Sequence, residues 1–297
     1  MRLLVAGSTG FLGSHLVEGL RAAGDDVVRL VRRPPTAPDE VPWDPAAGVL
    51  DLSALDGIDV VVNVAGSPTI GNPHSKKWAR NLRESRLSTT RTLAEAIAAH
   101  DAHPVYVAQN ALGWYGDHGC EVVTESSDSR GASFMTLVCR EWQQATDPAA
   151  EAGARVALLR TVPVMDRTAP PLKQLALAFR LGLGAQLSDG RQFFPVISLR
   201  DWTAAAVHVC HDAAISGPVN LCAPRTPTNA EFTHALARAL HRKALVRVPA
   251  FAIKVGAGRM AGEVLGSVNV RPEVLDRAGF EFSDHDVDDV LAVGLAR

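Results

Sequence analysis

A glycine-rich segment, Gly7-Ser8-Thr9-Gly10-Phe11-Leu12-Gly13, is the feature that most constrains the fold of this 297-residue chain. It follows an apolar run at 3–6, typical of a buried strand, and opens a segment at 12–23 whose apolar residues recur at helical spacing. Gly7 permits a tight turn, Gly10 lets the backbone approach a phosphate chain, and Gly13 allows close packing of helix on strand. Because the N–H groups at such a helix start bind phosphate, we predict a nucleotide-binding loop. The residues expected to contact the nucleotide are Gly7, Thr9, Gly10, Phe11, Leu12 and Gly13.

Two arginines follow the second expected strand, at 27–31. In dinucleotide-binding folds, an acidic residue at this place binds the ribose 2′-hydroxyl, whereas a basic residue accommodates a 2′-phosphate. Val31 stands about where the acid would be, and Arg32 and Arg33 come next. The pattern favours NADP over NAD. The alternative is a solvated basic turn that precedes Pro34.

Two later segments are expected to border the same ligand. Asp51 and Leu52 precede a short helical stretch and are placed over the adenine. A continuous apolar run at 59–64 predicts a buried parallel strand, and it ends in the small residues Ala65 and Gly66. Since ligands bind at the carboxyl ends of parallel strands, we expect Ala65 and Gly66 to contact the cofactor.

Strands and helices alternate through the first half of the chain, with further strands expected at 104–108 and 155–159 and helices at 76–100 and 131–145. This alternation predicts an α/β fold, a Rossmann-type doubly wound parallel sheet. After Pro163 the rhythm changes to shorter elements. We therefore predict an NADP-binding domain at 1–163 and a smaller substrate-side lobe at 164–297, the two being intertwined.

Composition and charge argue against several classes of binding partner. A formal net charge of -2 without a basic tail argues against nucleic-acid binding. No apolar run approaches the roughly 20 residues of a membrane span, and the N-terminal apolar run is too short for a signal peptide, so we expect a cytoplasmic protein without a membrane partner. The four cysteines are scattered, as in a reducing compartment. His208 and His211 share a helix face but lack further ligands, so we predict no metal site.

Taken together, these motifs resemble the extended short-chain dehydrogenase/reductase superfamily, in particular its epimerase-like branch with a C-terminal domain of unknown function. The similarity covers nearly the whole chain. Besides the glycine loop, it rests on short motifs at 43–45, 63–66, 85–86, 113–116, 139–142, 179–184, 190–192, 217–220 and 278–282. The resemblance implies NADP(H) in a cleft and a small-molecule substrate.

The sequence departs from that superfamily where catalysis is expected. The resemblance implies a Tyr-x-x-x-Lys pair for proton transfer, but Phe134 and Val138 occupy these places. The branch usually has serine before the glycine-aromatic turn, whereas this chain has Gln109 and Asn110. Tyr115 is then the best remaining acid or base, its alternative role being packing beside Trp114. The Asn110 amide is suited to hydrogen-bond a substrate oxygen but not to transfer a proton.

These features predict an NADP-dependent oxidoreductase or epimerase-like enzyme that acts on a small carbonyl or hydroxyl compound. The absence of the Tyr and Lys pair supports an alternative, a noncatalytic NADP-binding redox sensor or interaction protein. A third possibility is an enzyme that uses the cofactor without net oxidation. The sequence leaves a homodimer open.

Overall fold

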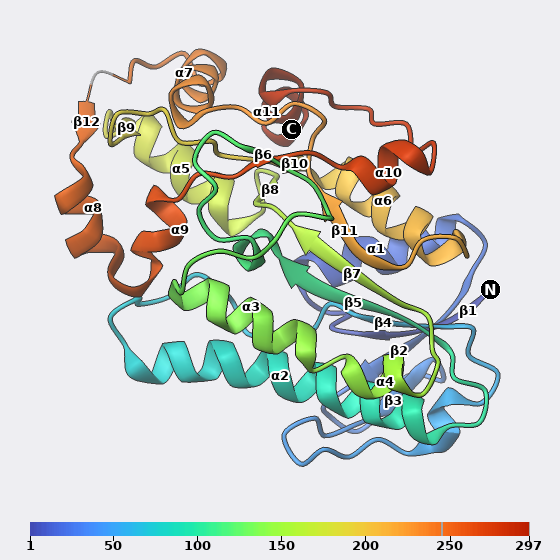
Figure 1. The fold of residues 1–297 in the computed structure, drawn as a ribbon. Helices are drawn as coiled ribbons and strands as arrows, with labels where there is room; N and C mark the ends of the chain where they lie inside the picture. Colours follow the sequence, from blue (N-terminus) through green and yellow to red (C-terminus); the bar gives the residue numbers. More distant parts are fainter. Residues whose placement is uncertain (245, 297) are drawn as a thin grey trace.

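Seven parallel strands form the central sheet of the computed structural model, which describes residues 1–244 and 246–296 (Figure 1). Their order in the sheet is β11-β7-β5-β4-β1-β2-β3, and every neighbouring pair is parallel. The strands are β1 (Arg2–Ala6), β2 (Asp26–Val31), β3 (Glu40–Pro42), β4 (Val60–Asn63), β5 (Val105–Ala111), β7 (Val156–Thr161) and β11 (Gly217–Leu221). The order reverses between β1 and β4, which is where open α/β sheets bind ligands. The predicted doubly wound sheet is confirmed.

Helices cover both faces of this sheet (Figure 1). On one face α1 (Phe11–Ala22) packs against α6 (Leu199–His211). On the other face α2 (Lys76–Ala99) packs against α3 (Phe134–Gln144) and α4 (Asp147–Glu151). The long amphipathic helix expected at 76–100 is therefore present, and both faces of the parallel strands are covered, as such strands require.

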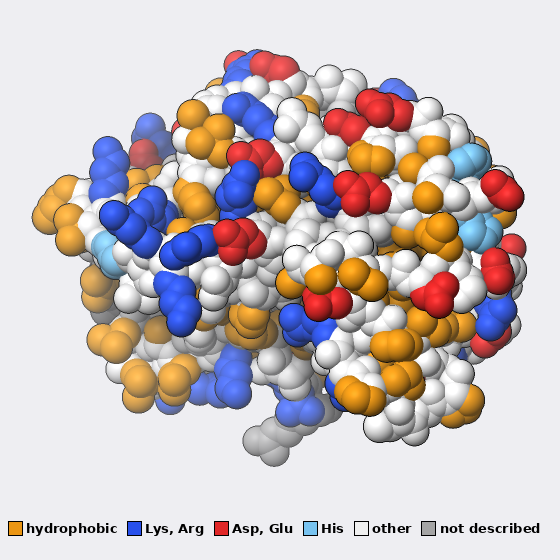
Figure 2. All heavy atoms as spheres, turned by 90° about the horizontal axis from the view of Figure 1, so that it is seen from below, with side chains coloured by type: hydrophobic (Ala, Val, Ile, Leu, Met, Phe, Trp, Pro, Cys, Tyr) orange, Lys and Arg blue, Asp and Glu red, His pale blue; other side chains and the backbone are white. Residues whose placement is uncertain are grey.

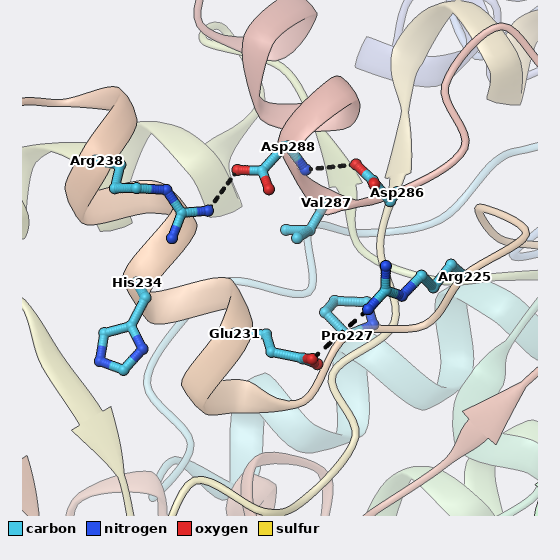
Figure 3. A pocket seen from close by; sticks show the side chains of 8 residues that line it. All are labelled: Arg225, Pro227, Glu231, His234, Arg238, Asp286, Val287 and Asp288. Carbon is cyan, nitrogen blue, oxygen red and sulfur yellow. Dashed lines mark hydrogen bonds and ion pairs between the residues drawn. The ribbon is translucent and has the colours of Figure 1, made fainter.

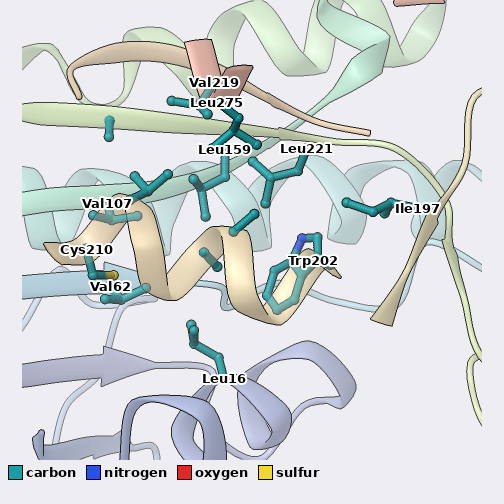
Figure 4. Packing of buried hydrophobic residues seen from close by; sticks show 14 of the residues in the cluster. Leu16, Val62, Val107, Leu159, Ile197, Trp202, Cys210, Val219, Leu221 and Leu275 are labelled. Carbon is teal, nitrogen blue, oxygen red and sulfur yellow. The ribbon is translucent and has the colours of Figure 1, made fainter. Parts of the chain in front are cut away.

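Alternate residues of β1 enter two separate hydrophobic cores. Leu3 and Val5 belong to the core beneath α1 and α6, together with Leu16 and Trp202 (Figure 4). Leu4 and Ala6 belong to the core on the α2 side. This alternation follows from the two-residue period of a strand, and it explains why a continuous apolar run, rather than an alternating one, marks the strand in the sequence.

Shorter elements build a second lobe over the carboxyl ends of the strands (Figure 1). Three two-stranded pairs occur there, β10 with β8, β12 with β9, and β13 with β6. The elements outside the main sheet are η1 (Leu52–Leu55), η2 (Leu112–Trp114), β6 (Val122–Val123), β8 (Val164–Met165), α5 (Pro170–Arg180), β9 (Ala185–Leu187), β10 (Ile197–Ser198), α7 (Asn229–Ala239), β12 (Val246–Val248), α8 (Ala250–Ala257), η3 (Gly258–Met260), α9 (Ala261–Leu265), β13 (Asn269–Val270), α10 (Glu273–Arg277) and α11 (Val287–Gly294).

The chain crosses the boundary predicted at residue 163 more than once. α6 packs on α1, and β11 forms the edge of the main sheet beside β7, although both follow that boundary. The two lobes are thus interleaved in sequence, and the division into 1–163 and 164–297 stays a prediction.

One local expectation needs correction. The strand expected at 104–108 continues to Ala111 as β5, so Gln109 and Asn110 lie within the strand. Farther along the chain, α8, η3 and α9 are separate elements, because Gly258 has a φ of +50°, a conformation that interrupts a right-handed helix. A capping box begins α7, with Thr228 as the N-cap residue and Glu231 as its partner.

The described residues contain no helix long and apolar enough to cross a membrane. Within the same residues, no group of three or more His, Cys, Asp or Glu side chains is arranged to hold a metal ion. All four cysteines are free; Cys120 is exposed and the others are buried.

Candidate cofactor and active site

The glycine loop lies against the end of β4, as a nucleotide-binding loop requires. Gly7 has a φ of +86°, and a methyl group on it would lie 2.7 Å from the backbone nitrogen of Ala65. A methyl group on Gly13 would lie only 2.0 Å from the carbonyl oxygen of Gly7. Neither position can hold a larger residue without backbone movement. The structure thus brings the loop and Ala65 together at the point where the strand order reverses.

The amino end of α1 has unused hydrogen-bond donors. Gly10 is the N-cap residue, and no side chain caps the helix. Among residues 1–244 and 246–296, no acceptor faces the backbone N–H groups of Phe11, Leu12 or Gly13. The first turn also carries no acidic residue that would compete with an anion. Free N–H groups and the helix dipole together provide a site for a phosphate group.

Ser8 belongs to this loop and was missed by the sequence analysis. Its side chain is buried, and its hydroxyl has no hydrogen-bond partner in the described structure. A buried hydroxyl without a partner is costly, so a ligand oxygen beside it would restore a lost hydrogen bond. A hydroxyl residue between the first two glycines is the sequence signal that would have identified it. Thr9, which was predicted, is exposed on the same loop.

The two arginines after β2 have different environments. The guanidinium of Arg33 donates to both carboxylate oxygens of Glu40, at 2.7 and 2.8 Å, and to Thr36. Hydrogen bonds from Arg33, and then from the backbone of Thr36, lower the pKa of Glu40 to about 2. Arg32 is exposed and makes no hydrogen bond or ion pair with any described residue. Arg32 is therefore free for a phosphate, whereas Arg33 is held within its own turn.

Asp51 and Leu52 lie where the chain enters η1. The Asp51 carboxylate accepts hydrogen bonds from the backbone N–H and the hydroxyl of Ser53, at 3.0 and 2.9 Å, and these bonds lower the pKa of Asp51. Leu52 is exposed. The carboxylate therefore caps a short helix, while the side chain of Leu52 is open to contact. Their placement over an adenine stays a prediction.

A buried arginine, Arg86, adjoins Gly66 at the end of β4. A methyl group on Gly66 would lie 3.6 Å from Cγ of Arg86. The guanidinium donates to the carbonyl oxygens of Ser67 and Leu82 and to the hydroxyl of Thr69. It has no carboxylate partner among the described residues, and burial lowers its pKa. Arg86 thus shapes the turn that follows Gly66, a contact for which the motif at 85–86 was the only sequence signal.

Tyr115 is enclosed by protein groups. Its side chain is fully buried, and its hydroxyl donates to Oδ1 of Asn220 at 2.7 Å. Its ring packs edge-on against Trp114 at 5.3 Å between centroids, and the guanidinium of Arg160 lies 4.6 Å from the ring centre. Burial raises the pKa of Tyr115 to about 12. The geometry favours the alternative role of packing over that of an acid or base.

Asn110 has no free polar atom either. It is fully buried within β5, where Oδ1 accepts from the N–H of Ala111 at 2.7 Å and Nδ2 donates to the carbonyl of Cys139 at 3.2 Å. Its amide therefore joins β5 to α3. Gln109, one residue earlier, donates to the carbonyl of Asn110, while its Oε1 is buried without a partner. Of the two amides, only that of Gln109 retains an unused acceptor.

Phe134 and Val138, which occupy the places of the superfamily's Tyr and Lys, also have apolar surroundings in the structure. Phe134 begins α3 and lies beside Trp78 of α2, with 5.9 Å between ring centroids. Val138, one turn later, is buried in a small hydrophobic cluster with Leu82 and Cys139. Neither position carries a proton donor.

Two hollows on the surface lie apart from these residues. One, of about 170 Å³, separates α7 from α11 and is crossed by an ion pair of 2.7 Å between Arg238 and Asp288 (Figure 3). The other, of about 610 Å³, is an open groove beside α1 and α6, bordered by His15 and Thr203. Neither is lined by any predicted site residue.

Comparisons with known proteins agree with this arrangement. Residues 3–132 match the NAD dependent epimerase/dehydratase family, and residues 248–293 match a domain of unknown function, DUF1731. An epimerase family protein of Mycobacterium bovis is 38% identical over 294 residues, which cover 99% of this chain and 97% of the relative.

Two solved structures are similar over the whole chain. The crystal structure of the human epimerase family protein SDR39U1 with NADPH has a TM-score of 0.85 and 29% identity, with 98% of each chain covered. The structure of a nucleoside-diphosphate sugar epimerase from Corynebacterium glutamicum has a TM-score of 0.80 and 32% identity, and the similarity covers 99% of this chain and 58% of the other. This chain therefore belongs to the NAD dependent epimerase/dehydratase family, in the extended short-chain dehydrogenase/reductase group whose members carry the C-terminal DUF1731 domain.

Proposed function

We propose that this protein binds NADPH and reduces a small carbonyl compound with it. The observation that carries the proposal is a group of unpaired hydrogen-bond donors at the amino end of α1. Three backbone N–H groups and the Ser8 hydroxyl have no acceptor there among the described residues. Support comes from the human relative, whose crystal structure contains NADPH. Gly7 and Gly13 let the loop pack tightly against Ala65 and against its own turn, which is the compact geometry that a phosphate-binding loop uses.

Specific residues hold the cofactor in this proposal. The N–H groups of Phe11, Leu12 and Gly13 hold the pyrophosphate, and Ser8 donates its hydroxyl to it. Arg32 holds the 2′-phosphate, because its guanidinium is exposed and unpaired in the described structure. Ala65 and Gly66 border the cofactor at the end of β4. The bound nicotinamide supplies the hydride.

Proton delivery differs from that of a Tyr and Lys pair. Phe134 and Val138 exclude a side-chain donor from α3, and the hydroxyl of Tyr115 already donates to Asn220. We therefore propose that water supplies the proton to the substrate oxygen. The half-buried Gln109, with its unused Oε1, is placed at the end of β5 and orients that water or the substrate hydroxyl.

NADPH and NADH titrations with thermal unfolding test the cofactor assignment. A ligand at 100 times its dissociation constant stabilises the native state by about 2.7 kcal/mol. We expect NADPH to raise the melting temperature at lower concentration than NADH does. Absence of a shift with NADPH at any concentration contradicts the cofactor assignment and with it the proposed reaction.

A noncatalytic NADPH-binding protein is the second candidate. The enclosure of Tyr115 and Asn110 by protein hydrogen bonds favours it. Incubation with NADPH and a panel of aldehydes and ketones separates the two, because reduction consumes the absorbance of the reduced nicotinamide. Tight NADPH binding without turnover of any compound supports the sensor. Product analysis then identifies an epimerase-like reaction, which leaves that absorbance unchanged.

A further inference from the structure

A basic segment at 232–262 contrasts with the rest of the chain. It contains six Lys and Arg residues and no Asp or Glu, although the whole protein carries a formal net charge of -2. The segment includes the end of α7 and the elements β12, α8 and η3. The proposed cofactor site uses none of it, so its charge calls for a separate explanation.

Large hydrophobic side chains are exposed on the same elements. Phe251 and Val255 stand one turn apart on α8 and are 71% and 72% exposed. Val246 on β12 is exposed, as are Leu181 and Leu183 after α5. β12 pairs with β9, which follows Leu183 closely in the chain, so these exposed side chains belong to one region. Scattered single hydrophobic residues are normal on a surface, but a group of this kind marks an interaction site.

Exposed basic side chains surround these hydrophobic residues. Lys243, Arg247 and Lys254 are exposed and make no ion pair with a described residue. Two more exposed lysines, Lys76 and Lys77, begin α2 directly after the segment that contacts α8, where Nε2 of His74 lies 3.3 Å from the carbonyl oxygen of Gly256. Figure 2 shows hydrophobic and basic side chains together at the end of the molecule where Figure 1 places α8. We call this region the α8 end.

We propose that the α8 end docks on the surface of an anionic phospholipid bilayer. Hydrophobic side chains of Phe251 and Val255 enter the headgroup layer, while the unpaired lysines and arginines contact lipid phosphates. Charge complementarity selects this occupant, because Lys243, Arg247 and Lys254 have no acidic partner among the described residues and are free for a headgroup. Neither hollow described above is lined by these side chains.

This docking is peripheral. No helix in the described part of the chain is long and apolar enough to cross a bilayer. The sequence-based expectation of no membrane partner was built on the lack of a spanning segment, and that argument does not apply to a surface contact. The proposal also does not depend on the proposed reaction, because the α8 end shares no residue with the cofactor site.

Vesicle sedimentation with the full chain tests the proposal. Vesicles of phosphatidylcholine are compared with vesicles of phosphatidylcholine and phosphatidylglycerol in equal amounts. We expect binding to the anionic vesicles only, weakened by salt because the Debye length falls to about 3 Å at 1 M ionic strength. The double variant Lys243→Glu/Arg247→Glu is expected to lower the partition coefficient roughly 30-fold or more. Phe251→Glu/Val255→Glu is expected to abolish binding.

Matched controls carry the same changes elsewhere on the surface. Arg91→Glu/Arg277→Glu reverses two exposed charges, and Val49→Glu/Val122→Glu alters two exposed hydrophobic residues. Each control is expected to lose only as much vesicle binding as its change in net charge explains. The melting temperature and its shift with NADPH show that each variant is folded.

Three outcomes contradict the proposal. The first is absence of binding to anionic vesicles at low salt by the unaltered protein. The second is an equal loss in the α8-end variants and their controls, which assigns the effect to net charge alone. The third is a dimer in sedimentation velocity that Phe251→Glu/Val255→Glu converts to monomer without any vesicle binding, which assigns the α8 end to a contact between two copies of the chain.

Discussion

The two polar regions at the carboxyl ends of the strands differ in what their hydrogen-bonding groups do. At β1 and β4, the N–H groups of Phe11, Leu12 and Gly13 and the Ser8 hydroxyl have no partner in the described structure. At β5 and β11, the hydroxyl of Tyr115 and the amide of Asn110 are all engaged. The groups of the first region are unpaired. The Tyr115 hydroxyl and the Asn110 amide are satisfied by other protein groups.

The contrast extends to the neighbours of Tyr115, which bind one another. Arg160 packs over Trp114 at 3.6 Å and over Tyr115, and Glu125 accepts from the N–H of Asn220 at 2.9 Å. Within this network the Tyr115 hydroxyl and the Asn220 amide satisfy each other, whereas Nε and Nη1 of Arg160 and Oε2 of Glu125 have no partner in the described structure. We therefore expect changes near β1 to alter binding and changes near β11 to alter stability.

The largest effect is expected for Gly13→Ala. The added methyl group would lie 2.0 Å from the carbonyl oxygen of Gly7, so α1 and the loop must separate. We expect NADPH binding to fall by on the order of 100-fold and stability by about 1–3 kcal/mol, the usual cost of overpacking. Calorimetric titration and denaturant unfolding measure these. Gly256→Ala is the control, because a methyl group there meets nothing within 4 Å. Unchanged NADPH affinity in Gly13→Ala would contradict the site.

A smaller effect separates the two arginines. Arg32→Ala should weaken NADPH binding by roughly tenfold, the value of about 1.4 kcal/mol for a charged hydrogen bond, and leave NADH binding unchanged. Arg33→Ala should affect the two cofactors equally, because its guanidinium is bound to Glu40. Competitive titrations of both cofactors measure the ratio. If Arg33→Ala changes the NADPH to NADH ratio more than Arg32→Ala does, the structural separation of the two arginines is wrong.

The sequence predicted the local geometry of the glycine loop but not the tertiary contacts of Tyr115, for a physical reason. Gly7 and Gly13 are required by backbone geometry that local sequence determines, so their roles could be predicted from spacing alone. Tyr115 is placed by Asn220, which lies 105 positions later in the chain, and no local pattern reveals that bond. The same limit applies to Arg33, whose partner Glu40 stands on β3 across an irregular segment.

The two tyrosines of the chain test the β11 side of the comparison. Tyr115→Phe leaves Oδ1 of Asn220 without its donor, so we expect a loss of about 1–3 kcal/mol of stability with NADPH affinity unchanged. Tyr106→Phe is the matched control, since that hydroxyl is also fully buried and donates to the carbonyl of Thr90 at 3.1 Å. Similar losses in both variants indicate a structural role. A fall in turnover that is confined to Tyr115→Phe would restore it as a catalytic residue.

The smallest effect concerns acid stability on the β2 side. Hydrogen bonds from Arg33 and the Thr36 backbone lower the pKa of Glu40 to about 2, below its ordinary value of 4.5. A carboxyl group with a lowered pKa in the folded state stabilises the protein above its unfolded pKa, and this contribution is lost as the pH falls toward the folded pKa. The loss of stability from Glu40 is therefore expected between pH 4.5 and about 2.

Glu40→Gln should remove this part of the pH dependence and should lower stability at neutral pH. Urea unfolding over that pH range measures both effects. Asp51→Asn is the control, because the Asp51 carboxylate also has a lowered pKa but bonds only Ser53. Two unchanged results would contradict this: the same loss of stability at acid pH in Glu40→Gln as in the unaltered protein, and the same selectivity for NADPH. Glu40 would then not hold Arg33 in its turn, and Arg33 would be as free as Arg32 to bind a phosphate.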